Sequence, residues 1–250
     1  MLALLRSLDA ADWSRPTDCT GWSVHDVVAH LVGSMDEATN LPRFAWHALA
    51  APRRFPALNL LDALNAAQVG ARRAWDAGRL LAEFERLAPR AVRARQHTPA
   101  LIRRITPPSG FTLPPGMRLG HVFDVIVVRD CWLHRVDIAR ACGRDVPAAE
   151  YDADVVELVI RDLDRGWNGP PIVLELSGAA GGNWRIGEGE PAATVRADAV
   201  ECCRSLSGRA ADLNRDDDTG SRDPRDGSDG GTGSDYSTPA AMLRAARVVF

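Results

Sequence analysis

Apolar residues recur at helical spacing along residues 117–143, MRLGHVFDVIVVRDCWLHRVDIARACG, which predicts one long helix with a buried face. Three polar residues, Asp130, His134 and Asp137, lie on the same stripe at positions i, i+4 and i+7. Burying acid and imidazole groups costs free energy unless they pair or bind a ligand. The spacing leaves two interpretations: Asp130 and His134 hold one divalent metal, or they form a buried hydrogen bond.

A second histidine lies on a predicted apolar helix near the N-terminus. In residues 17–34, TDCTGWSVHDVVAHLVGS, Ser23 is a good N-cap, and Asp26 three residues later gives an acidic version of the capping box. The valines and leucines that follow share one side of the helix, and His30 lies beside them. His25 projects away from that side and is expected to be solvated. Taken alone, His30 is best interpreted as a core histidine bonded to a neighbour.

The remaining segments of the first 143 residues complete a predicted bundle of four main helices. Residues 2–9 are rich in leucine and predict a short first helix. Residues 58–97 carry leucine and alanine at helical spacing and predict helix with a core-facing stripe. Residues 42–56 begin and end with proline and are interpreted as a connection, in which His47 has no obvious partner.

After Gly143 the pattern changes to helix and short strands, which predicts a small α+β domain. Residues 214–237 contain almost no large apolar side chain and are expected to be disordered, because they cannot bury enough surface to offset chain entropy. The sequence thus predicts a helical domain over residues 1–145 and an α+β domain over residues 150–250. The predicted elements of the second domain are a helix at 151–167, strands at 172–176, 183–186 and 192–197, a helix at 198–207 capped by Asp198, and a final helix and strand within 239–250.

Composition and charge exclude several classes of function. The 250 residues are 46% hydrophobic and 25% charged, which is typical of globular proteins. The formal net charge of −3 gives no basic field for nucleic acid, and no apolar run is long enough to span a bilayer. The five cysteines show no CxxC pair or disulfide pattern, and no secretory signal is visible. A protein of the reducing cytoplasm, without nucleic-acid or membrane partners, is therefore expected.

Three segments resemble one known family. TDCTGWSVHDVVAHL at residues 17–31 and RDCWLHRVDIARACG at residues 129–143 resemble, in order and spacing, the mycothiol-dependent maleylpyruvate isomerase family. PAATVRADAVECCRSLSGR at residues 191–209 looks like the small C-terminal domain of that family. The resemblance implies an α+β chain in which a DinB-like four-helix bundle precedes a small sterol-carrier-like domain.

The resemblance also implies a divalent metal, usually zinc, held by His30, Asp130 and His134. The family often has Glu at the position of Asp130, and the shorter Asp would bring the metal nearer to its helix or hold it less tightly. Two histidines and one carboxylate leave an open position on zinc for water or thiolate. Asp137, one turn further on, is expected to support the ligands or to pair with a neighbouring arginine rather than to bind the metal.

In the reaction of that family, a low-molecular-weight thiol adds to a cis double bond, the new single bond rotates, and loss of the thiol leaves the trans product. The resemblance therefore implies a metal-dependent thiol transferase or isomerase that uses mycothiol or a similar thiol on a small electrophilic molecule. The metal would lower the thiol pKa or polarise a carbonyl oxygen. Arg209 resembles the glycine-arginine position of the family and is the candidate for binding a substrate carboxylate; the alternative is a surface arginine at a helix end.

Two other functions fit the same residues. One is a non-catalytic, metal-binding DinB-like module in a stress or regulatory role, in which a fourth protein ligand would close the site. The other is a partner-binding regulator with a vestigial metal site. The sequence is compatible with a monomer or a homodimer. Four of the five cysteines are not expected to act as nucleophiles: Cys131, Cys142, Cys202 and Cys203.

Overall fold

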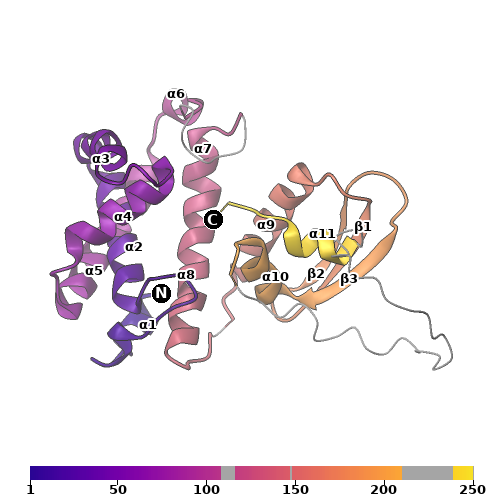
Figure 1. Cartoon of the computed structure of the whole chain (residues 1–250), viewed down its shortest axis with the longest axis horizontal. Helices are drawn as coiled ribbons and strands as arrows, with labels where there is room; N and C mark the ends of the chain where they lie inside the picture. Colours follow the sequence, from indigo (N-terminus) through magenta and orange to yellow (C-terminus); the bar gives the residue numbers. More distant parts are fainter. Residues whose placement is uncertain (108–115, 147, 210–238, 250) are drawn as a thin grey trace. The chain divides into compact units, whose positions relative to one another are not determined.

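The chain forms a helical unit followed by a small α+β unit (Figure 1), which confirms the predicted fold class. The computed structural model describes residues 1–107, 116–146, 148–209 and 239–249. These residues divide into two compact units, Met1–Val146 and Pro147–Phe250. The segment at 214–237 that the sequence predicts to be disordered lies outside the described residues.

Helix α2 is the central element of the first unit, and it packs against α5, α4 and α8. Its valines and Leu31 form the core together with Leu80, Phe84 and Leu87 of α5. The predicted capping box is present, since Ser23 Oγ accepts from Asp26 N at 3.3 Å and Asp26 Oδ2 accepts from Ser23 N at 3.0 Å. The helices of this unit are α1 (Leu2–Arg6), α2 (Val24–Thr39), α3 (Leu41–Arg54), α4 (Leu60–Arg72), α5 (Ala77–Gln96), α6 (Ala100–Arg103), α7 (Leu119–His121) and α8 (Val127–Ala141).

Two predictions about the first unit need correction. Residues 42–56, interpreted as a connection, form helix α3, because Asn40 caps its first turn and Pro42 sits where a missing N–H costs nothing. His47 on this helix does have a partner, since its Nδ1 lies 2.6 Å from Glu37 Oε1. The predicted helix over residues 117–143 is present from Leu119 to Ala141, and a π-helical turn at Val122–Ile126 lies within it, between α7 and α8.

The second unit is built on a three-stranded sheet of order β2–β1–β3, in which β1 pairs antiparallel with β2 and parallel with β3. On the central strand Ile172, Leu174 and Leu176 are buried, and the residues between them are half-buried. These elements match the predicted ones, except that residues 246–249 form no final strand. The elements are α9 (Asp152–Gly166), β1 (Ile172–Ser177), β2 (Gly182–Ile186), β3 (Ala193–Asp198), α10 (Ala199–Leu206) and α11 (Pro239–Ala245).

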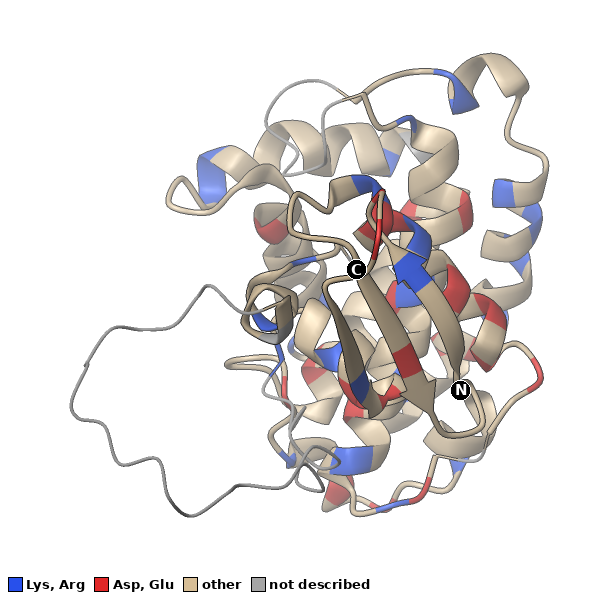
Figure 2. Ribbon diagram, turned by 90° about the vertical axis from the view of Figure 1, so that its right-hand side faces the viewer, with Lys and Arg blue, Asp and Glu red and all other residues tan. Residues whose placement is uncertain are grey.

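Charge and hydropathy agree with a globular fold in each unit. Acidic and basic residues are scattered over the helices and strands (Figure 2). None of the helices in the described part of the chain combines the length and the apolar character needed to cross a membrane.

Candidate metal centre

The packing of α2 against α8 brings together two side chains from one helix and a third from about a hundred residues earlier in the sequence. His30 extends from α2, and Asp130 and His134 extend from one face of α8. His30 Nε2 lies 3.3 Å from Asp130 Oδ2, and His134 Nε2 lies 3.2 Å from Asp130 Oδ1. One ligand atom from each residue lies within 4.8 Å of the others, so a single ion could contact all three.

The hydrogen bonds of the two rings determine which nitrogen of each carries a proton. His134 Nδ1 lies 3.0 Å from Oδ2 of Asp137, a fully buried carboxylate. A carboxylate can only accept, so this nitrogen donates, and the lone pair of a neutral His134 is on Nε2. His30 Nδ1 in turn lies 2.8 Å from Gln68 Oε1, which leaves its lone pair on Nε2 as well. Both lone pairs therefore point toward the Asp130 carboxylate.

The lone pairs of His30 and His134 and the carboxylate of Asp130 are all acceptors, so they repel one another unless a positive charge lies between them. Without a metal, that charge is a proton. Burial alone would raise the pKa of Asp130, but the charges of His134 and His30 and their hydrogen bonds hold this pKa well below its ordinary range. Burial likewise lowers the pKa of His134, but Asp130 and the hydrogen bond to Asp137 raise it well above the usual histidine value. A divalent cation would replace this proton, and the donor set of two nitrogens and one oxygen suits zinc.

The loop before α2 supplies an aromatic wall to the site. The Trp22 ring lies 5.3 Å from the His30 ring and 6.3 Å from the His134 ring, centroid to centroid. The loop is held by hydrogen bonds from Thr17 N and Oγ1 to the carbonyl of Trp22, each 2.9 Å long. Gly21 has a φ of +78°, which a glycine adopts without strain. Trp22 thus packs beside both histidine rings.

The centre is open on the side of Asp130. The Asp130 side chain keeps 21% of its surface exposed, against 6% for His30 and 5% for His134. Within the part of the chain that the structure describes, no fourth His, Cys, Asp or Glu side chain joins this group. An ion held here would retain a position for an external ligand, which is typical of catalytic rather than structural zinc.

The other sequence-predicted residues belong to the second unit or behave as expected for packing residues. Arg209 belongs to the second unit, where its N–H donates to Arg204 O directly after Gly208 ends α10. Burial raises the pKa of the Cys131 thiol, and it raises the pKa of Cys202 to about 12. Neither cysteine is therefore a ready thiolate at neutral pH.

Sequence reasoning missed the residues that support the histidines from outside the stripe. Cys19 Sγ lies 3.3 Å from Asp137 Oδ2 and 3.7 Å from His134 Nδ1. Trp22 and Gln68 complete the surroundings of the two rings. One signal was visible: Gln68 is a polar residue four positions after Leu64 on an apolar stripe, the same kind of pattern that singled out Asp130.

Comparison with known proteins yields one family and one fold. The family model for the mycothiol maleylpyruvate isomerase N-terminal domain matches residues 1–139. A crystal structure of the mycothiol-dependent maleylpyruvate isomerase is similar to this chain, with a TM-score of 0.50 and 17% identity over 84% of both chains. A structure of a histidine-to-alanine mutant of that enzyme matches with a TM-score of 0.50 and 16% identity, over 84% of this chain and 83% of the other. No curated protein sequence matches this chain.

Proposed function

The chain belongs to the mycothiol maleylpyruvate isomerase N-terminal domain family, and on this premise we propose that it is a metal-dependent thiol transferase or isomerase with mycothiol as its cosubstrate. The observation that carries the proposal is the convergence of the His30 and His134 lone pairs on Asp130, on a side that keeps access to solvent. The substrate class is a small electrophilic molecule with an activated cis double bond. The solved structures support the fold behind this proposal.

The residues of the centre fit a divalent metal, and zinc above all. His30 Nε2, His134 Nε2 and one Asp130 oxygen would hold the ion. Bound there, a divalent cation supplies a positive charge that lowers the pKa of a thiol, so that thiolate is available at neutral pH. Asp137 and Gln68 fix the two rings by accepting hydrogen bonds from their Nδ1–H groups.

The chemistry of the reaction then assigns tasks to the side chains around the centre. The thiolate sulfur forms a bond to one carbon of the double bond, and the π electrons move to the conjugated carbonyl group. After rotation, the same carbon–sulfur bond breaks and the thiolate leaves, so the thiol is not consumed. Trp22 excludes water from one side of the site, and the exposed side of Asp130 is where thiol and substrate would approach. We assign the substrate carboxylate to Arg209, whose guanidinium can bind it through two parallel hydrogen bonds.

The non-catalytic alternative, a DinB-like metal-binding module in a stress or regulatory role, makes a different prediction for the same centre. A purely structural site is closed by a fourth protein ligand. The exposure of Asp130 supports an open site and hence the catalytic proposal.

Metal analysis of the purified protein is the direct test. We expect about one zinc per chain in the wild type and loss of that zinc in His134→Ala, because two remaining ligands hold zinc weakly. His97→Ala is the matched control, since His97 is exposed and its ring bonds to the carbonyl of Arg93 one turn earlier in the chain. The metal-loaded wild type should then convert a cis substrate to its trans isomer only when mycothiol is present. A wild type without metal, or with thiol-independent turnover, would overturn the proposal.

A further inference from the structure

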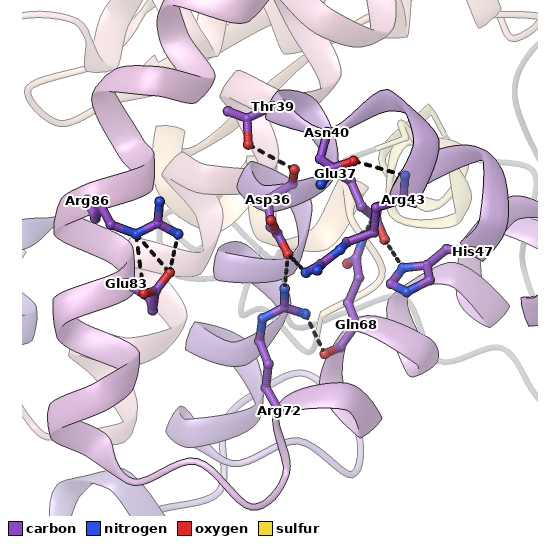
Figure 3. A network of polar contacts seen from close by, with 10 residues as sticks. All are labelled: Asp36, Glu37, Thr39, Asn40, Arg43, His47, Gln68, Arg72, Glu83 and Arg86. Atoms are coloured by element: carbon purple, nitrogen blue, oxygen red, sulfur yellow. Dashed lines mark hydrogen bonds and ion pairs between the residues drawn. The ribbon is translucent and has the colours of Figure 1, made fainter.

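A row of polar side chains leads from the candidate metal ligand His30 to the surface of helix α3. His30 Nδ1 contacts Gln68 Oε1 at 2.8 Å, and Gln68 Nε2 donates to Glu37 Oε2 at 2.6 Å. The other oxygen of Glu37 lies 2.6 Å from His47 Nδ1. Figure 3 shows Glu37 between Gln68 and His47, among the charged residues that surround it. The row thus joins three helices, with His30 and Glu37 on α2, Gln68 on α4 and His47 on α3.

The chemistry of each group in this row dictates the orientation of the next. A carboxylate only accepts hydrogen bonds, so the side of the Gln68 amide that faces Glu37 must be its NH₂ group. The carbonyl oxygen of Gln68 must then face His30, and the His30 nitrogen opposite it must carry a proton. The result is a His30 ring with its proton on Nδ1 and its lone pair on Nε2, the atom that faces Asp130.

Burial makes this arrangement costly unless each of its hydrogen bonds is made. Gln68 is 5% exposed and Glu37 is 6% exposed. A buried amide or carboxylate costs free energy unless its hydrogen bonds are made, and apolar residues would fill the same space without that cost. Helix α4 comes so close that a Cβ at Gly33, three residues after His30, would lie 2.6 Å from Gln68 Cβ. The close helix contact therefore holds the Gln68 amide beside the His30 ring.

We propose that Gln68 and Glu37 are positioning residues that lock His30 in the tautomer able to bind a metal, with His47 holding the outer oxygen of Glu37. The inference rests on the proposed function only in taking His30 as a metal ligand. The tautomer itself is a property of the metal-free chain. The lock weakens with distance from His30, so the effect of a substitution should decrease from Gln68 to Glu37 to His47.

The critical variant is Glu37→Gln, which keeps the shape of the side chain but supplies both a donor and an acceptor. The amide of Gln68 is then free to turn, and His30 can exchange its proton between the two nitrogens. Nitrogen NMR of labelled histidines in the metal-free protein at alkaline pH should show a protonated Nδ1 in the wild type and a tautomer mixture in the variant. Zinc affinity, measured by chelator competition, should fall about 10- to 100-fold in Gln68→Met and less in Glu37→Gln and His47→Ala.

Glu83→Gln is the matched control, because Glu83 forms an ordinary helix-surface pair with Arg86 in the same view (Figure 3). This control should keep the wild-type tautomer and zinc affinity. A wild type with its His30 proton on Nε2, or a Glu37→Gln protein with the wild-type tautomer, would overturn the inference. If Gln68→Met does not fold, the His30 tautomer and the zinc affinity of Glu37→Gln and His47→Ala still test the inference. A protein that binds no zinc yet keeps the His30 Nδ1 proton would refute the proposed function and leave the tautomer lock standing.

Discussion

At the scale of single residues, the buried carboxylate of Asp137 has a clear role, because it orients the neighbouring His134 ring. Its carboxylate accepts hydrogen bonds from His134 Nδ1–H at 3.0 Å and from the Cys19 thiol at 3.3 Å. These bonds offset the cost of burying the charge and orient the imidazole at the same time. The residue therefore orients His134, one of the candidate metal ligands.

We predict that Asp137→Asn weakens zinc binding by about 10- to 100-fold, the usual effect of losing a hydrogen-bond partner of a metal-binding histidine. Asparagine offers both a donor and an acceptor, so it no longer requires a proton on His134 Nδ1. Chelator competition measures the change, and Asp154→Asn at an exposed position of the second unit is the control. Equal zinc affinity in Asp137→Asn and wild type would show that Asp137 does not orient the ring.

A second residue-scale prediction concerns acid stability. The hydrogen bond from Arg144 to Asp12, 2.6 Å long, and a backbone hydrogen bond from Asp9 lower the pKa of Asp12. A depressed carboxyl pKa stabilises the fold above the unfolded-state value of 3.8, and the stabilisation is lost as the pH falls through the folded-state value. Urea unfolding at a series of pH values between about 6 and 3 should therefore show a smaller acid-induced loss in Asp12→Asn than in the wild type. Parallel pH curves for the two proteins would contradict this assignment.

At the scale of helices and strands, regular local patterns could be predicted from the sequence. The capping box of α2, the strands β1 to β3 and the candidate ligand pair on α8 all follow from spacing within one segment. Helix α3 was missed because the segment begins and ends with proline, although Pro42 lies in the first turn of the helix and Pro56 lies beyond its end at Arg54. The contacts of Gln68 and Trp22 with His30 join separate segments, and no local pattern contains that information.

The approach of α4 to α2 gives a prediction at the same scale. In Gly33→Ala the new methyl group would lie 2.6 Å from Gln68 Cβ, so α4 must move away from His30. We expect a loss of about 1–3 kcal/mol in the free energy of unfolding, as for other overpacked cores, together with weaker zinc binding. Gly70→Ala on α4 is the matched control, because its nearest neighbour is Arg54 Nη2 at 3.9 Å. The control should instead gain up to about 1 kcal/mol from helix propensity. Unchanged unfolding and zinc binding in Gly33→Ala would show that the close contact is not required.

At the scale of the whole molecule, the candidate metal ligands and the candidate substrate-binding arginine belong to different units. His30, Asp130 and His134 all lie within Met1–Val146, as do the residues that orient them. Arg209 lies within Pro147–Phe250. If each unit contributes a separate part of the activity, metal binding and substrate binding can be impaired independently.

Arg209→Ala tests this division. We expect Arg209→Ala to keep its zinc content and the tautomers of His30 and His134, because the substitution changes none of the groups around the candidate metal centre. Its kcat/KM should fall about 10- to 100-fold, since a hydrogen bond to a charged group contributes roughly 1.5–3 kcal/mol. The kcat/KM of Arg209→Lys should lie between those of the wild type and Arg209→Ala, because lysine keeps the positive charge but cannot form the bidentate contact with a carboxylate.

Arg165→Ala controls for loss of a surface charge from the same unit, since the Arg165 side chain is 68% exposed and pairs with Asp162. Its zinc content and its kcat/KM should both equal those of the wild type. Loss of zinc in Arg209→Ala would mean that the second unit is needed to hold the metal. Wild-type kinetics in that variant would remove Arg209 from substrate binding and leave the carboxylate to another cation, while the metal centre of the first unit would keep its proposed role.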